Sequence, residues 1–475
     1  MTRTIPRLLL VAAGPLPGGR GVADGPAFAA ERAVDVARAA TAAGLEVCAV
    51  VAGSDRDQPG TERVARLAEV TGRAVHRVDA RLMPVPVLQR IVARVSEGSD
   101  LCLVVAPESL SDEDLLGAGL FDLARGLDAP SVLCADLARG REAVSVVRKA
   151  LRRLERVEAG RDGRPLVLAA ECAEGRVGDG LAAGAEEVLL TPPLGPGGMR
   201  LASDDLAVLL SHARRAPSLP PAVRHQRRHA RARIGVVLDE CFDLYDEESL
   251  AQFEAAGAQL VPIPAFDDGG AVGFDPRGDG DVESEVLDGL IIGDGLVEAY
   301  SARLAEAAGV RAALRRLIES GAPTIAGGGG LAFLTEGMRT LSGSFHPFLG
   351  VLSGHAVAVA GTLPRGHVEV ELAEDGPTGP AGARLRGYAQ RRWLVRGLLP
   401  SVRAEYRTLS GPPDVGARGD ALLALHFRPY WPSYPRAATV FVDRCLRHAA
   451  RRDAAALQSG PAEGRGDGDE AEGAA

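Results

Sequence analysis

The stretch LLLVAAGPLPGGRG, residues 8–21, sets the fold class of this chain. Its apolar run at 8–12 predicts a buried strand, and the glycines and prolines after it predict a turn into a helix over 26–43. The same order recurs along the first half, with a second clear helix over 139–156. Strands that are apolar throughout are typical of a parallel sheet covered by helices on both faces. Further strands are expected at 47–52, 101–106, 131–135, 166–170 and 187–190.

A second α/β pattern begins at residue 234. Strands are expected there at 234–238, 259–262, 289–292 and 324–326, with helices over 248–256 and 299–320. A later, more strand-rich portion includes 367–372 and 422–427. The fold class predicted for the chain is therefore α/β, with two doubly wound domains.

The domain boundaries follow from changes in composition. We expect a first domain at 1–212, a linker at 213–233, a second domain at 234–452 and a disordered acidic tail at 453–475, which cannot bury a core. The linker is dense in arginine, histidine and proline. It is either a solvated connection or a docking segment for an acidic partner or phosphate.

Composition excludes several classes of protein. The 475 residues carry a formal net charge of -9, which argues against general nucleic-acid binding. No apolar run approaches the roughly 18 residues of a membrane span, so no membrane association is expected. The first apolar run leads into a strand–turn–helix pattern, and we interpret it as structure rather than a signal peptide. Lys149 is the one lysine in the chain, which restricts lysine chemistry to that position.

The cysteines indicate a reducing compartment. There are six, at positions 48, 102, 134, 172, 241 and 445, and none forms a CxxC pair. Several stand in apolar runs, where cysteine behaves as a small core residue. This pattern disfavours zinc and disulfides and predicts a cytoplasmic protein.

The glycine loop after the first strand has the spacing of a phosphate-binding loop. Gly14 and Gly19 match its two glycines, but Arg20 stands at the lysine position and Gly21 at the hydroxyl position. Two prolines inside the loop remove N–H donors, and an arginine fork does not replace a lysine point charge. Gly14, Gly19 and Arg20 are therefore candidates for nucleotide binding, and a structural glycine turn is the alternative.

Seven stretches of the second half, in this order, resemble the cobyrinate (hydrogenobyrinate) a,c-diamide synthase family. The resemblance extends over essentially 1–450, because the first half fits the P-loop amidoligase domain of that family and the second half its class I glutamine-amidotransferase-like domain. The stretches are IGVVLDECFDLYDEESL (234–250), LDGLIIGDGLVE (287–298), SGAPTIAGGGGLAFL (320–334), FLGVLSG (348–354), GPTGPAGARLRG (376–387), LLALHF (422–427) and FVDRC (441–445).

The resemblance implies a two-part reaction. A cysteine thiolate with a histidine base would hydrolyse glutamine in the second domain. The first domain would use ATP and magnesium to activate a corrinoid carboxylate, which ammonia then converts to an amide.

The second domain departs from the family pattern at the reacting positions. Gly327 and Gly328 stand where the family has glutamate and the cysteine nucleophile, and glycine offers no nucleophile. Ala424 holds the histidine base position, and His426 matches the orienting position, although a packing or surface role is the alternative. Asp294 holds the middle place of a Gly-Gly-Gly turn, where a carboxylate would repel a developing oxyanion.

The first domain departs in the same way. Val105 ends the strand whose last residue should be a magnesium-supporting glutamate. Asp55 survives in a metal and substrate loop and is a weak metal candidate, while Gln58 replaces the second aspartate. Asp136 lies where an acidic residue ends another strand in the family. A simple cap of the strand is the alternative.

Three hypotheses follow. The first is a non-catalytic paralogue that keeps the scaffold and binds a corrinoid, another small molecule or a partner protein. The second is an active amidoligase that uses free ammonia or a relocated nucleophile such as Cys241, for which a place in the core is the alternative. The third is a regulatory or structural partner of an intact synthase.

Overall fold

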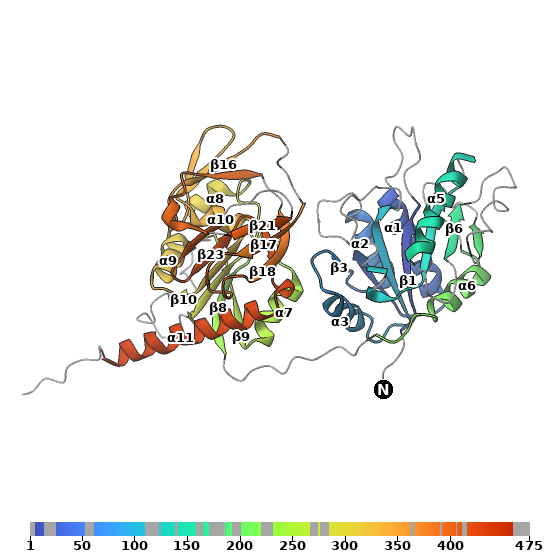
Figure 1. The fold of residues 1–475 in the computed structure, drawn as a ribbon, viewed down its shortest axis with the longest axis horizontal. Coiled ribbons are helices and arrows are strands. Elements are labelled where there is room, and N and C mark those ends of the chain that lie inside the picture. Colours follow the sequence, from blue (N-terminus) through green and yellow to red (C-terminus); the bar gives the residue numbers. More distant parts are fainter. Residues whose placement is uncertain are drawn as a thin grey trace, which may run out of the picture. The chain divides into compact units, whose positions relative to one another are not determined.

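The chain forms two compact units, Met1–Arg224 and His225–Ala475, shown as a computed structural model in Figure 1. The two units divide inside the stretch 213–233 that composition marks out. The structure describes residues 5–13, 25–52, 61–109, 123–124, 126–137, 141–157, 165–170, 185, 187–191, 201–219, 231–266, 274–275, 285–361, 363, 366–389, 392–404, 406–410 and 416–458.

The first unit is built on a seven-stranded parallel sheet in the order β3-β2-β4-β1-β5-β6-β7. All six residues of β1 are buried, so both faces of the sheet are covered. Helix α1 supplies Ala29, Ala33, Ala37 and Ala40 to the core, and this three- and four-residue spacing places them on one helix face. The elements are β1 (Arg7–Ala12), α1 (Gly25–Ala42), β2 (Val47–Ala52), α2 (Thr61–Thr71), β3 (His76–Val78), α3 (Val85–Val95), β4 (Leu101–Ser109), β5 (Ser131–Asp136), α5 (Arg141–Val157), β6 (Leu166–Ala170), β7 (Val188–Thr191) and α6 (Ser203–Ala213).

The second unit has a central sheet in the order β20-β22-β23-β13-β12-β8-β9. Its five strands from β9 to β23 are parallel, and β22 and β20 continue it antiparallel. The central elements are β8 (Ala232–Val237), α7 (Glu247–Ala255), β9 (Ala258–Ile263), β12 (Gly289–Ile292), α8 (Ser301–Glu306), α9 (Ala308–Glu319), β13 (Thr324–Gly327), α10 (Gly329–Leu334), β20 (Arg403–Ala404), β22 (Gly416–Gly419), β23 (Leu422–Leu425) and α11 (Arg436–Gln458).

Smaller strands surround this central sheet. Two four-stranded sheets have the orders β15-β14-β16-β19 and β21-β17-β18-β24, and β10 pairs with β11. Together they make the later part of the chain rich in strands, as the sequence predicts. The strands are β10 (Phe274–Asp275), β11 (Glu285–Val286), β14 (Gly337–Arg339), β15 (Phe345–Pro347), β16 (His355–Ala358), β17 (Gly366–Leu372), β18 (Arg384–Ala389), β19 (Trp393–Arg396), β21 (Tyr406–Ser410) and β24 (Arg428–Tyr430).

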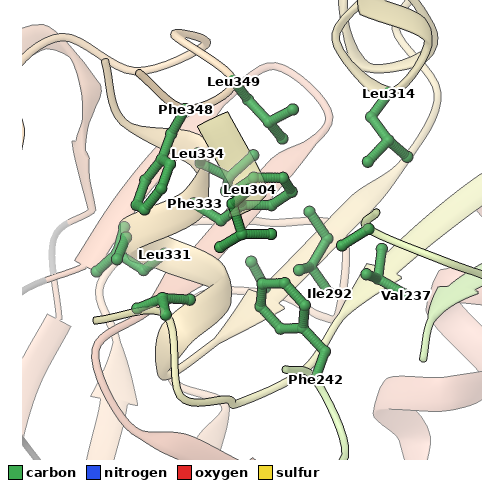
Figure 2. Close-up of a cluster of buried hydrophobic side chains, with 14 of the residues drawn as sticks. Val237, Phe242, Ile292, Leu304, Leu314, Leu331, Phe333, Leu334, Phe348 and Leu349 are labelled. Atoms are coloured by element: carbon green, nitrogen blue, oxygen red, sulfur yellow. The ribbon is translucent and has the colours of Figure 1, made fainter. Parts of the chain in front are cut away.

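One apolar core holds the short helix α10 in place. Phe333 of α10 lies between Phe242 and Phe348, with ring centroids 5.4 Å and 5.5 Å away (Figure 2). Leu331 and Leu334 of the same helix are also fully buried. A large buried aromatic group fixes its helix strongly, so the turn that leads into α10 has a rigid support.

The predicted α/β class with parallel sheets is confirmed. The strands expected at 47–52, 166–170 and 289–292 have those bounds. The single helix expected at 299–320 is wrong, because the chain breaks at Ala307, whose ψ is 60°. Nη2 of Arg311 donates to the carbonyl of Ala305 at 2.8 Å, so this carbonyl at the end of α8 has a partner outside the helix.

The tail prediction is wrong over its first six residues. Helix α11 continues to Gln458, past the boundary expected at residue 453. The alanines at 454–456 have the highest helix propensity, which explains the extension. None of the described helices combines the length and apolar character needed to cross a membrane.

Candidate functional site

A sharp turn joins β13 to α10 at the position of the expected nucleophile. Gly328 has φ 52° and ψ -122°, a conformation that costs other residues about 1–3 kcal/mol. Its N–H points to the carbonyls of Leu425 and Phe427, at 2.9 Å and 3.1 Å, which ties the turn to the end of β23. A strained strand–turn–helix of this kind is the geometry of a nucleophile elbow.

The side chain of Asp294 fills the space at this elbow. Asp294 follows β12 and is 7% exposed. Its Oδ1 accepts hydrogen bonds from the backbone N–H groups of Gly329, at 2.7 Å, and Gly295, at 2.8 Å. The N–H of the residue after the nucleophile is one of the donors that stabilise an oxyanion in enzymes with such an elbow. Here that donor already serves an internal carboxylate.

The same contact excludes any side chain at position 328. A β-carbon built on Gly328 would lie 2.1 Å from Oδ1 and 2.2 Å from Cγ of Asp294. Such distances are far inside van der Waals contact, so either the carboxylate or the added carbon must move. Gly328 and Asp294 are therefore a matched pair.

Burial works against the charge on Asp294. Loss of solvent raises the pKa of this carboxyl, and the Gly329 hydrogen bond, the cation of Arg428, the Gly295 hydrogen bond and Arg392 offset the rise in part. The upward shift means that the protonated form is favoured more in the folded chain than in water.

Tyr245 braces the segment that carries Asp294. Its hydroxyl donates to the carbonyl of Val237 at 2.5 Å and accepts from the N–H of Gly293 at 2.7 Å. Leu244 forms an isolated antiparallel bridge with Asp294. Burial raises the pKa of the Tyr245 phenol, so it remains a neutral donor. The turn at 293–295 is thus held on two sides.

The cavity beside Asp294 is small. It measures about 30 Å³, and its lining includes Tyr245, Asp294, Gly327, Arg428 and Asp246. Arg428 and Asp246 form an ion pair at 3.6 Å. About 10–15 Å³ of such volume holds one water, so this cavity is the size of one or two waters.

The histidine positions of the family are occupied by packing residues. Ala424 is fully buried in β23, opposite Ala326 of β13. His426 is 5% exposed, and its ring stacks on Trp393 with centroids 4.3 Å apart. His426 therefore lies in the packed interior, and position 424 offers no base.

Cys241 belongs to the core. It is fully buried in the cluster that includes Phe242 and Val297. Burial and the charge of Asp239 raise the pKa of its thiol, so the reactive thiolate is disfavoured. Oδ1 of Asp239 accepts the N–H of Cys241 at 2.8 Å and holds this turn. The alternative that gives Cys241 a place in the core matches these observations.

The site residues predicted in the first unit lie mostly outside the described residues. The residues outside the described part are Gly14, Gly19, Arg20 and Asp55. Lys149 is on α5 and exposed.

Two strands of the first unit can still be compared with the predicted magnesium site. Val105 does not end its strand as expected, because β4 continues to Ser109. It is 1% exposed and pairs with Leu10 and Val51 of the neighbouring strands. Its side chain has no oxygen, so this position does not fit a magnesium ligand. Asp136 is the last residue of β5. In the described part of the chain, no group of three or more histidine, cysteine, aspartate or glutamate residues could hold a metal ion.

The sequence singles out both Gly328 and Asp294 but not their contact. The two residues are 34 positions apart, and nothing in the pattern GDG (293–295) says that its carboxylate turns toward α10. The signal that the sequence does offer is a glycine at position 328, where a side chain is expected, together with an aspartate at position 294, where a glycine is expected. Both residues lie in turns at the carboxyl ends of neighbouring strands.

Curated relatives are similar in sequence to part of this chain. The cobyrinate a,c-diamide synthase of Syntrophotalea carbinolica is 30% identical over 249 residues, which are 51% of this chain and 52% of that protein. The hydrogenobyrinate a,c-diamide synthase of Streptomyces coelicolor is 30% identical over 220 residues, 45% of this chain and 40% of that protein. The chain thus matches about half the length, or less, of these relatives. No family model matches the chain.

A solved glutamine amidotransferase is also similar in part. It covers 45% of this chain and 98% of its own, with a TM-score of 0.30 and 19% sequence identity. At this TM-score the similarity identifies neither the fold nor the function.

Proposed function

We propose that this chain is a cobyrinate a,c-diamide synthase-like protein of corrinoid biosynthesis whose second unit does not hydrolyse glutamine. The names of the relatives, at 30% identity over about half the chain, support the corrinoid assignment. The occupied elbow supports the lack of glutaminase activity.

The proposed lack of glutaminase activity rests on the hydrogen bond from Gly329 N–H to Asp294 Oδ1 at 2.7 Å. Glutamine hydrolysis through a thioester needs a nucleophile at position 328, a base and free oxyanion donors. Position 328 has no side chain, position 424 is alanine, and a carboxylate occupies the donor. The second unit therefore serves as a scaffold, for a corrinoid, another small molecule or a partner protein.

The test is an amidation assay on the purified full chain with cobyrinate, ATP and magnesium. Nitrogen-15 is supplied either as amide-labelled glutamine or as ammonium, and the products are read by mass spectrometry. We expect no glutamate release and no labelled amide from glutamine. Labelled amide from glutamine would contradict the proposal, and labelled amide from ammonium alone would identify an ammonia-dependent ligase instead.

A further inference from the structure

A second cavity of the second unit lies at the amino ends of the central strands β13 and β23, opposite to the elbow. It is bordered by Pro323 and Ala421, which immediately precede β13 and β23, and by α11. The elbow with Gly328 follows the carboxyl end of β13, so the two sites are at different ends of the same strand. The second cavity, which we name the α11 groove, has a volume of about 1080 Å³. This is slightly more than the roughly 300–1,000 Å³ that ligand sites occupy.

Five basic residues of α11 line the groove. Their spacing is i, i+3, i+4, i+7 and i+8, which places them on one face of the helix over about 12 Å. Asp420 is the one acidic residue in the lining. The groove is therefore strongly cationic. The basic residues are Arg444, Arg447, His448, Arg451 and Arg452.

Three of these cations have no acidic partner in the described part of the chain. Arg452 pairs with Asp288 at 3.0 Å and with Asp453 at 3.1 Å. Arg444, Arg447 and Arg451 form no ion pair with any described residue, although Nε of Arg451 donates to the carbonyl of Arg447 at 3.3 Å. Like charges three and four positions apart destabilise a helix.

Interaction with the dipole of α11 does not account for this cluster of cations. Cations stabilise a helix through its dipole only within the last turn, and α11 ends at Gln458. Arg444 lies about four turns before that end. His448 is buried in the same place, and burial together with Arg452 and Arg451 lowers its pKa, as expected where cations concentrate.

We propose that the α11 groove binds a linear polyphosphate group, carried by inorganic triphosphate or by a nucleoside triphosphate. Guanidinium forks bind phosphate oxygens in pairs, and Arg444, Arg447 and Arg451 follow one another along the helix at rises of about 4.5 Å and 6 Å. A row of this length fits several linked phosphates better than a single anion. Gly321, Pro323 and Ala421 give the lining an uncharged part, against which we expect the nucleoside of a triphosphate to pack.

The test is calorimetric titration of the full chain with sodium tripolyphosphate, ATP and citrate. The variant Arg447→Gln/Arg451→Gln removes two groove cations. The control Arg384→Gln/Arg407→Gln removes two exposed cations of β18 and β21 that pair with Glu371, away from the groove. Circular dichroism checks that both variants fold.

We expect saturable tripolyphosphate binding that weakens with salt and falls at least about tenfold in the groove variant, but not in the control. Tighter binding of ATP that is lost in the same variant would identify the nucleotide as the ligand. Unchanged binding in the groove variant would overturn the proposal, and so would citrate binding as tightly as tripolyphosphate. Both outcomes are independent of glutaminase activity.

Discussion

The carboxylate of Asp294 fills the space that a β-carbon at position 328 would need. Oδ1 of Asp294 would lie 2.1 Å from a β-carbon at position 328, and it accepts the N–H of Gly329 at 2.7 Å. The absence of a side chain at position 328 and the presence of a carboxylate at position 294 therefore form one structural arrangement. A side chain added at position 328 while Asp294 is kept should therefore destabilise the fold.

A side chain at position 328 should destabilise the chain. For Gly328→Ala we expect a loss of about 3–5 kcal/mol in the free energy of unfolding, from backbone strain and displacement of the buried carboxylate. Gly343→Ala is the matched control, because Gly343 also has positive φ, 88°, but nothing lies within 4 Å of its added carbon. We expect about 1–2 kcal/mol for the control. Denaturant unfolding measures both, and equal losses would contradict the clash.

The charge on Asp294 should make stability depend on pH. The pKa of this carboxyl is raised in the folded chain by burial, so between the unfolded and folded pKa values the folded state binds more protons. Its contribution is fully present below the unfolded pKa of 3.8 and is lost as pH rises through the folded pKa. Asp294→Asn keeps an oxygen acceptor without the charge. Its stability relative to the parent chain should therefore rise as pH increases above about 4.

Denaturant unfolding at several pH values checks this dependence. An Asp294→Asn variant that becomes less stable than the parent as pH rises would mean that the folded site favours the carboxylate.

Much of the fold follows from the sequence because its signals are local. Strands such as 47–52 and 289–292 are apolar runs between turn residues, and their bounds can be predicted to the residue. The break at Ala307 could not be predicted. It accompanies a side chain, Arg311, that binds a carbonyl of the preceding turn, a contact that residue spacing does not reveal.

The candidate site is predictable by position but not by contact. The empty nucleophile position at Gly328 and the extra carboxylate at Asp294 are both visible in the sequence. Their relationship depends on a hydrogen bond between turns after β12 and β13, and on the brace of Tyr245 beneath one of them. Side-chain direction across a sheet edge has no signature in residue spacing.

Cys241 should be unreactive in the folded chain. It is fully buried, and burial together with Asp239 raises the pKa of its thiol. We expect alkylation by iodoacetamide to be on the order of 100-fold slower in native protein than in denaturant, as located by peptide mass spectrometry. Rapid native alkylation at Cys241 would instead support a relocated nucleophile.

His426 should act through packing. Its ring stacks on Trp393 with centroids 4.3 Å apart in the buried interior. We expect His426→Ala to cost about 2–3 kcal/mol of stability, and His426→Phe to recover part of it by keeping the stack. Thermal unfolding compares the two variants. Full stability in His426→Ala would show that the stack contributes nothing.

A double-mutant cycle tests whether Asp294 occupies the space that a side chain at position 328 would need. The free energy of unfolding is measured for the parent chain, Gly328→Ala, Asp294→Ala and the double variant. Because Asp294→Ala removes the atoms that clash, we predict that Gly328→Ala costs at least about 2 kcal/mol less in that background. Costs that add within about 0.5 kcal/mol would mean that Asp294 and a side chain at position 328 do not compete for this space.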